Sequence, residues 1–428
     1  MGVACVRAGT AHAAPVPEVT VIRAEQPPRI DGRLDDACWQ GAPLITDFRC
    51  NDPARSLPTQ RTEAWVVCDD DALYVAAKCH EDRMDLVQAV ETGFDGRVWR
   101  DDCLEVFLMP STPYYYHFAA NLLGTRYDAR HDVEAGNGET TPERWDAEWR
   151  VGAQRGESYW SMEIAIPLAC LEWGPERVAA PLRLNIGREQ HRLAEFSCWP
   201  ASEFSKVEEF AVLEGLTVDP RRYGLVLRDM SVGEMAPGPN RFSATVEEET
   251  ASGTPITLRA RVQPLPQGQI REYTAHATSA PGAGLNVDYQ VPVAGGRVAV
   301  TVECLDGRGK ARTSYHEVLR VPAPVEASLD LPLLYQSDTH VRVSGRVALP
   351  ASLRRGAKLQ AALICGGRRL TAVSVPLADG TGRFLVQLPV NELPAGRYAV
   401  ETRLTAPALG AEPITSQFPF RLIAGPFD

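Results

Sequence analysis

The 428-residue sequence lacks any apolar run long enough to cross a membrane, and it lacks any Cys-x-x-Cys pair. A membrane span needs roughly 18 consecutive apolar residues, so the sequence predicts no membrane span. Zinc and thiol-redox sites commonly use closely spaced cysteines, and the ten cysteines here show no such spacing. Several of them lie inside apolar runs, where cysteine usually serves as a small buried hydrophobic residue.

Basic character is also scarce, above all in the front half of the chain. Up to Pro220 there are 37 acidic and 21 basic residues, whereas the remainder has 18 acidic and 23 basic residues. Nucleic acid requires a basic surface for its phosphates, so the acidic front half argues against a nucleic-acid partner. The slight positive charge of the rear half is too weak to indicate any partner, and protein partners stay unknown.

Tryptophan is absent after residue 199, although eight tryptophans lie up to that point, and seven of the ten cysteines lie between Cys38 and Cys198. This change in composition predicts a domain boundary near Asp219-Pro220, and the chain is too long for a single core. We predict four segments, which are an export-signal remnant or flexible tail at residues 1–17, a β-sandwich at residues 18–222, and immunoglobulin-like β-sandwiches at residues 223–323 and 324–428.

Short stretches of alternating apolar and polar residues dominate the front segment. Between Trp160 and Ile166 every second residue is apolar, which is typical of one face of a strand. Pro167 should end that strand, because proline cannot donate to the ladder. Residues 62–68 and 73–77 flank a polar turn and predict a hairpin. Many such strands and few helical periods predict an all-β chain with a jelly-roll-like sandwich at the front.

Strand-length runs continue through the rear half, which also contains a weak repeat. Residues 290–293 followed by residues 296–300 resemble residues 387–390 followed by residues 396–400. The offset of nearly 100 residues matches one immunoglobulin-like sandwich, and residues 322–324 (Pro-Ala-Pro) would form a stiff linker between two copies. The alternative is a chance match among β-rich sequences.

A set of motifs in the front segment keeps the order found in one protein family. The set opens with residues 30–39, where an Asp-Gly turn is followed by Asp35, which can cap a short helix, and by Trp39, which should enter the core. The later members are residues 70–76, 98–108, 118–124, 160–167, 184–188, 198–200 and 210–213. Together they resemble family 9 carbohydrate-binding modules and their relatives over about residues 18–220. The resemblance implies a β-sandwich that binds a polysaccharide or oligosaccharide without catalysis.

In that family two aromatic side chains hold a terminal sugar between them. Trp99 matches the first by position, and Phe204 falls where the second, usually a tryptophan, would lie. Pyranose rings present flat C–H faces that stack on aromatic rings, and their hydroxyl groups need acceptors and donors around the edge. The alternative for both residues is a core or rim aromatic side chain.

Glu105 is the candidate acceptor for sugar hydroxyl groups, as its family counterpart is. The aliphatic residues at 104, 106 and 108 should alternate inward, which places Glu105 on the other face of the strand with Cys103 and Phe107. The alternative is a carboxylate paired with a neighbouring arginine.

Three further ligand-binding candidates follow from a departure from the family pattern. Ala119 stands where well-known members have an arginine, whose guanidinium fork offers several donors at once. His117, Asn121 and Arg188 are the residues that could substitute for it. The alternative for Arg188 is a pair with a buried acid.

No catalytic residue is predicted, and we expect the protein not to be an enzyme. Asp102 and Glu105 should lie on opposite faces of one strand, so they cannot form the spaced carboxylate pair of a glycosidase. No cofactor is certain. Calcium is possible through an oxygen-rich cluster, whose candidate ligands are Asp69, Asp70, Asp71 and Asp82. The alternative is a solvated hairpin turn.

The leading hypothesis is a binding protein that is accessory to polysaccharide recognition or breakdown, with the rear sandwiches as spacers or interaction modules. Its domain type, together with Ala11-His12-Ala13-Ala14, which suits signal-peptidase cleavage, leads us to expect export to the extracellular space or periplasm. One alternative is a b-type haem-binding sandwich, for which the candidate ligands are His117, Met84, Met109 and Met162. Another is a structural or adhesion scaffold whose sugar site has decayed.

Overall fold

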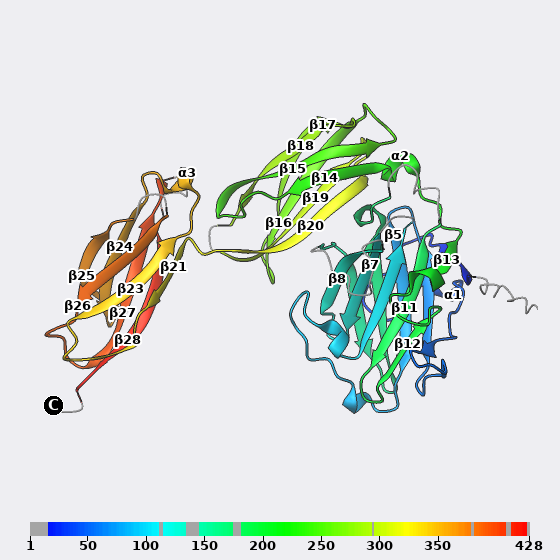
Figure 1. The fold of residues 1–428 in the computed structure, drawn as a ribbon, viewed down its shortest axis with the longest axis horizontal. Helices are drawn as coiled ribbons and strands as arrows, with labels where there is room; N and C mark the ends of the chain where they lie inside the picture. Colours follow the sequence, from blue (N-terminus) through cyan, green and yellow to red (C-terminus); the bar gives the residue numbers. More distant parts are fainter. Residues whose placement is uncertain are drawn as a thin grey trace, which may run out of the picture.

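The computed structural model describes residues 16–110, 114–133, 145–173, 181–292, 295–377, 381–407 and 412–425. Strands dominate these segments, and the helices in them are single turns of three or four residues. Six sheets form three sandwiches that follow one another along the chain (Figure 1). The all-β prediction is therefore confirmed, with a jelly-roll-like sandwich followed by two immunoglobulin-like ones. The proposed signal-peptidase motif lies outside the described residues.

The first sandwich packs an eight-stranded sheet against a five-stranded sheet. The larger sheet contains β1 (Glu18–Thr20), β3 (Arg49–Cys50), β6 (Cys103–Met109), β7 (Tyr114–Asn121), β8 (Arg126–Asp132), β11 (Arg183–Gln190), β12 (Glu195–Trp199) and β13 (Ala211–Glu214). The smaller sheet contains β2 (Ile22–Arg23), β4 (Thr62–Cys68), β5 (Ala72–His80), β9 (Arg150–Arg155) and β10 (Tyr159–Pro167). The helical turns are α1 (Ala37–Gln40), η1 (Met84–Leu86), η2 (Val98–Arg100), η3 (Leu168–Cys170) and η4 (Val207–Glu209).

Alternating side chains fill the space between these two sheets. Leu104 and Val106 of β6 and Met162 and Ile164 of β10 are fully buried in the same core. Burial of each such side chain contributes roughly 1.5–3 kcal/mol, so this core holds the sheets together. The predicted hairpin is the antiparallel pair β4 and β5, and β10 ends at Pro167 as expected.

The motif at residues 30–39 anchors the loop between β2 and β3 to a buried carboxylate of β10. The carboxylate of Glu163, on the face of β10 that points away from the main core, accepts hydrogen bonds from the backbone N–H groups of Asp31 (3.0 Å) and Gly32 (2.8 Å). It also accepts one from Trp39 Nε1 (2.8 Å), and Trp39 is buried as predicted. At Gly32, with φ +85°, a Cβ would lie 2.6 Å from the backbone of Ala153, so this position requires glycine.

One local prediction from this motif is wrong. Asp36, not Asp35, occupies the N-cap position of α1, and it makes no side-chain capping hydrogen bond. The Asp35 carboxylate instead accepts a hydrogen bond from Arg29 Nη2 (3.1 Å). The Asp36 carboxylate accepts a hydrogen bond from the backbone N–H of Arg29. Both acidic side chains therefore bind Arg29 and do not cap the helix.

The second and third sandwiches share one strand order. The second contains β14 (Leu225–Ser231), β15 (Gly238–Glu249), β16 (Pro255–Pro264), β17 (Arg271–Thr278), β18 (Gly284–Val291), β19 (Gly296–Leu305) and β20 (Ala311–Val321), and it follows α2 (Pro220–Tyr223). The third contains β21 (Val325–Leu329), β22 (Leu333–Tyr335), β23 (His340–Val347), β24 (Lys358–Cys365), β25 (Arg368–Val375), β26 (Arg383–Pro389), β27 (Gly396–Thr405) and β28 (Ile414–Ile423), with α3 (Ala351–Arg354). The sheets β14-β15-β18 and β17-β16-β19-β20 correspond to β21-β23-β26 and to β28-β27-β24-β25, read in the reverse direction.

The weak sequence repeat lies on equivalent strands of the two sandwiches. Its copies run from the end of β18 into β19 and from the end of β26 into β27, although residue 293 lies outside the described residues. In the third sandwich the Tyr398 hydroxyl donates to the carbonyl oxygen of Pro394 (2.8 Å), as in the tyrosine corner of immunoglobulin-like folds. The aligned residue of the second sandwich is Val298. The domain boundaries at 222/223 and 323/324 stay predictions.

The second sandwich sits against one end of the first, whereas an extended connection leads on to the third (Figure 1). The Asp71 carboxylate of the first sandwich pairs with Arg222 (2.5 Å) and Lys310 (2.6 Å). Asp146 accepts a hydrogen bond from the backbone N–H of Val318 (2.7 Å). These contacts fix the second sandwich on the first.

Each described helix is too short or too polar to cross a membrane. The nine described cysteines are all free, and seven of them are buried. Buried cysteine in these sandwiches therefore packs as a small apolar residue, as the apolar runs around it predicted.

Candidate functional site

The candidate site lies on the outer face of β6, β7, β8 and β11, which is the face turned away from the main core. Glu105 and Phe107 of β6 and His117 of β7 project from this face, because their neighbours Leu104 and Val106 point into the core. The predicted face of Glu105 is therefore correct. Two segments outside the strands cover this face and carry the predicted aromatic pair.

The first covering segment presents Trp99. Val98 anchors η2 by complete burial, whereas Trp99 is 36% exposed. The indole meets the ring of Tyr127 edge-on, with 4.8 Å between the ring centroids. The carboxylate of Asp101 fixes this segment by accepting hydrogen bonds from two backbone N–H groups and from Asn121 Nδ2 (2.8 Å). The indole is thus held at the surface on a rigid support.

The second covering segment presents Phe204, which stacks on Phe107 with 6.1 Å between the ring centroids and 13° between the planes. Phe204 also lies directly over Gly187, where a Cβ would come within 2.5 Å of the phenyl ring. Asn185 Nδ2 donates to the carbonyl oxygen of Phe204 (2.9 Å). Glycine at 187 therefore creates the space that this ring occupies.

Five rings form a continuous row between the two predicted platform residues. We call it the aromatic row, and its members in order are Trp99, Tyr127, His117, Phe107 and Phe204. Successive ring centroids are 4.8, 5.3, 4.3 and 6.1 Å apart. The sequence predicted both ends and His117, and the structure adds the two residues that connect them.

A carboxyl pair lies beneath the aromatic row. Glu105 is only 3% exposed, and its Oε2 lies 2.5 Å from His117 Nε2. Its Oε1 is buried and lacks a hydrogen bond of ordinary geometry among the described residues. The carboxyl group of Glu189 is its neighbour from β11, where Gly187 is paired with Glu105. The pair is the most unusual electrostatic feature of this face.

Burial keeps this face nearly uncharged. It raises the pKa of Glu105 to about 7, and burial followed by repulsion from Glu105 raises the pKa of Glu189 to about 9. Burial lowers the pKa of His117 to about 3, so the imidazole is neutral and can donate Nε2–H to Glu105. At neutral pH the three groups together carry at most one negative charge.

Two of the predicted ligand-binding residues are not brought to this row. Arg188 points to the inner side of the sheet, where its Nη2 donates to the carbonyl oxygen of His80 (2.8 Å) and its guanidinium lies over Trp160. Asn121 uses its amide group to hold the Trp99 segment through Asp101 and to close its own turn. We therefore leave both out of the proposed site. Ala119 is fully buried between Glu105 and Tyr127.

The acidic residues considered for calcium are used in other contacts. Asp69 closes its turn by accepting from two backbone N–H groups and from Tyr74, and Asp71 holds the second sandwich. Asp70 pairs with Arg23 and Asp82 pairs with Arg192. Among the described residues a different trio, Asp95, Asp128 and Asp146, brings its oxygens within 4.8 Å of one another. These three are too far apart in the sequence for spacing to reveal them.

Two of the methionines considered for haem, Met162 and Met84, lie away from His117. Met162 and Met84 are buried in the core between the sheets, on the other side of the sheet that carries His117. Met109 is partly buried beside the Phe107 cluster. Met162 is a core residue, in agreement with the apolar alternation between Trp160 and Ile166.

Glu189, Tyr127 and Phe107 are the site residues that the sequence did not single out as candidates. Glu189 follows Arg188 directly, and alternation along β11 places it on the outer face with Gly187. That alternation was a usable signal. Tyr127 lies in a strand that has no motif in common with the family, so nothing in the sequence pointed to it.

Comparison with known proteins supports the resemblance of the first sandwich to family 9 carbohydrate-binding modules. Residues 30–187 match the family model described as carbohydrate family 9 binding domain-like, which confirms the resemblance of the front segment. No curated protein matches the chain.

Solved structures show only weak similarity. A proposed carbohydrate-binding protein from Bacteroides uniformis is 17% identical, with 46% of this chain and 98% of that chain covered and a TM-score of 0.37. A family 9 module from Caldicellulosiruptor kristjanssonii with bound glucose is 14% identical, with 47% and 98% covered and a TM-score of 0.34. Fibronectin type III-like modules from Clostridium thermocellum are 10% identical, with 48% and 96% covered and a TM-score of 0.17. These similarities are too low to support an inference about function.

Proposed function

Because residues 30–187 match the family 9 carbohydrate-binding model, we propose that the outer face of the first sandwich binds a neutral saccharide without catalysis. The observation that carries the proposal is the exposed indole of Trp99 at the end of the aromatic row, which also contains His117, the hydrogen-bond partner of the buried Glu105. Trp99 provides a flat apolar platform for a pyranose ring. The carboxyl group of Glu105 would accept a hydrogen bond from a hydroxyl group in place of its hydrogen bond to Glu189.

The burial of Glu105 has a consequence for how binding occurs. At 3% exposure its carboxyl group is closed off, so covering side chains must move before a sugar hydroxyl group reaches it. His117 then orients Glu105 through the Nε2–Oε2 hydrogen bond. The weak charge of the face favours a neutral ligand, since no strong field attracts an ionic one.

The same carboxyl pair argues against glycoside hydrolysis. Glycosidases use two carboxyl groups roughly 5–10 Å apart that flank the bond to be cleaved. Glu105 and Glu189 are instead direct neighbours and share their titration, so no sugar bond fits between them. We propose a binding protein that is exported and accessory to polysaccharide recognition or breakdown, with the rear sandwiches as spacers or interaction modules.

The test is a glycan array with the full chain, followed by calorimetry with glucose and cellotriose and with any hit from the array. Trp99→Ala is expected to weaken binding about tenfold, the equivalent of losing roughly 1.4 kcal/mol of ring stacking. Tyr335→Ala is the control, because Tyr335 is an equally exposed aromatic residue in the third sandwich. Binding that Trp99→Ala leaves unchanged would remove the proposed site.

Two other outcomes favour the alternatives. Failure to bind any glycan would favour a scaffold with a decayed site, which Ala119 and the buried Glu105 would then explain. A Soret band in the absorbance spectrum of the purified protein would favour haem binding instead.

A further inference from the structure

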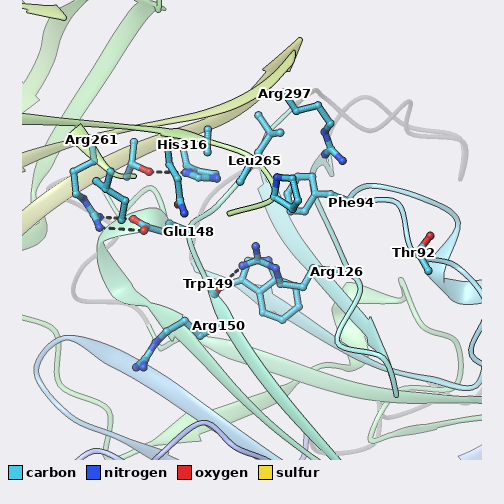
Figure 2. Close-up of a pocket in the computed structure, with 16 residues that line it drawn as sticks. Thr92, Phe94, Arg126, Glu148, Trp149, Arg150, Arg261, Leu265, Arg297 and His316 are labelled. Carbon is cyan, nitrogen blue, oxygen red and sulfur yellow. Dashed lines mark hydrogen bonds and ion pairs between the residues drawn. The ribbon is translucent and has the colours of Figure 1, made fainter. Parts of the chain in front are cut away.

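A pocket of about 390 Å³ lies between the first and second sandwiches, separate from the aromatic row (Figure 2). Its walls come from β8, β9 and the segment before η2 on one side, and from β16, β19, β20 and the loop after β16 on the other. Its volume lies within the roughly 300–1,000 Å³ typical of small-molecule sites. Neither sandwich alone forms it.

At one end of the pocket lies an arginine whose positive charge is balanced by an ion pair. Arg261 of β16 makes a two-pronged ion pair with Glu148, with 3.1 Å from Nη1 to Oε1 (Figure 2). Arg261 also lies 3.3 Å from the carboxylate of Glu303. The charge of Arg261 and that of the single acid in the pocket wall, Glu148, therefore cancel each other.

Three other arginines of the wall keep their charge. Among the described residues, Arg126, Arg150 and Arg297 form no ion pair with any carboxylate. Arg126 Nη1 donates to the carbonyl oxygen of Trp149, and its guanidinium lies 5.4 Å from the centre of the Phe94 ring. Arg297 reaches toward the same ring from the second sandwich, at 5.8 Å (Figure 2). Two guanidinium groups from different sandwiches thus converge on Phe94.

The acids outside the pocket wall do little to compensate Arg126. Asp95 and Asp128 attract it from beyond ion-pair distance. Burial and mutual repulsion raise the pKa of Asp95 to about 7 and the pKa of Asp128 well above its usual value, so both hold protons readily. Burial in turn lowers the pKa of Arg126, which reflects how poorly this cation is solvated. Arg126 is only partly exposed and has no carboxylate within ion-pair distance among the described residues, so an anion in the pocket would stabilise its charge.

Neutral polar groups complete the wall. His316 Nδ1 lies 2.7 Å from Thr301 Oγ1, and burial together with the nearby arginines lowers the pKa of His316 to about 3. The imidazole is therefore neutral and does not add to the positive charge. Gln263 lies on the same wall. These groups can bond hydroxyl groups, and Phe94 offers an apolar surface to a ring.

We propose that this pocket binds a small acidic sugar, whose carboxylate or sulfate group is held by Arg126 and Arg297. A guanidinium group presents a planar fork of donors that matches the geometry of an oxyanion. Arg150, exposed at the start of β9, adds attraction at the mouth. The site is independent of the proposed function of the aromatic row, since it uses none of the same residues.

The experiment is calorimetric titration of the full chain with glucuronate, glucose 6-sulfate and glucose. Binding of either acidic sugar supports the proposal, and the arm that binds more tightly identifies the oxyanion. Arg297→Gln is expected to weaken that binding about tenfold, since one charge-assisted contact is lost. Arg297 is exposed and has no ion-pair partner among the described residues, so this variant should fold normally. Arg126→Gln should have an effect of the same kind, checked against its melting temperature because Arg126 also supports Trp149.

The matched control is Arg308→Gln, which removes the same charge from an exposed turn of the same sandwich. It should leave acidic-sugar binding unchanged, as should Trp99→Ala. Absence of binding by both acidic sugars would overturn the proposal. It would also be overturned if Trp99→Ala abolished that binding while Arg297→Gln preserved it, because the ligand would then occupy the aromatic row. If neutral sugars failed to bind while acidic sugars still bound, the function proposed for the aromatic row would be contradicted and the proposal for the pocket would stand.

Discussion

The aromatic row and the pocket between the sandwiches both combine aromatic rings with ionisable side chains. The two regions differ in the charge that those ionisable side chains carry. On the outer face at neutral pH, Glu189 holds a proton, Glu105 is partly protonated and His117 is neutral, so rings dominate the surface. In the pocket, Arg126 and Arg297 stay ionised, and no carboxylate of the described residues pairs with either. Burial explains the difference, because carboxyl and imidazole groups can lose their charge near neutral pH whereas guanidinium cannot. One region therefore suits a neutral ligand and the other an anionic one.

The largest effect that separates the two regions is expected from Gly187→Ala. The new Cβ would meet the Phe204 ring at 2.5 Å, so the ring must leave its position on Phe107. We expect neutral-sugar affinity to fall about tenfold and the free energy of unfolding to fall by about 1–3 kcal/mol. Binding of acidic sugars should not change. Calorimetry and urea unfolding measure both quantities.

Gly307→Ala is the control for this substitution, because a Cβ at Gly307 would meet nothing within 4 Å. If Gly187→Ala kept full stability and full neutral-sugar affinity, Phe204 would have no part in the row.

A second test uses the pH dependence of stability on the outer face. The pKa of Glu189 is about 9 in the folded protein and near 4.5 in the unfolded chain. Between these values the unfolded state binds fewer protons, so stability is greatest at low pH and falls as pH rises toward about 9. Each fully titrating proton contributes a slope of up to about 1.4 kcal/mol per pH unit. Glu189→Gln should therefore reduce the loss of stability between pH 5 and pH 9.

Urea unfolding at pH 5, 7 and 9 measures this slope. Glu214→Gln, an exposed residue at the end of β13, serves as the matched control and should keep the parent slope. Equal slopes for the parent and Glu189→Gln would mean that Glu189 holds no proton at neutral pH.

The smallest expected effect concerns the pocket. Glu148→Gln removes the partner of Arg261 while keeping the size of the side chain. With only Glu303 left beside it at 3.3 Å, the Arg261 guanidinium should raise the affinity for acidic sugars about two- to fivefold, which is the usual range for a partly exposed ion pair. Neutral-sugar affinity should stay constant. A decrease in acidic-sugar affinity would show that the Glu148 pair is needed to keep the two sandwiches together.

Much of the first sandwich could be predicted from residue patterns. Alternation gave the faces of β6 and β10, and hence the outward position of Glu105. The same alternation along β11 also indicates that Glu189 lies on the outer face with Gly187. Asp35 could not be placed correctly, because Arg29 competes with the helix for both neighbouring acids.

The sequence by itself determined the all-β fold and the resemblance of the front segment to family 9 carbohydrate-binding modules. It also determined the positions of Trp99, Phe204, Glu105 and His117 on strands or turns. These follow from local periodicity and from motif order, which are properties of neighbouring residues. Only the tertiary structure decided that Glu105 is buried beside Glu189, that Arg188 faces inward, and that Arg126 and Arg297 meet at Phe94. Those outcomes depend on which distant strands become neighbours and on how much water each charge loses, and neither quantity is written in the spacing along the chain.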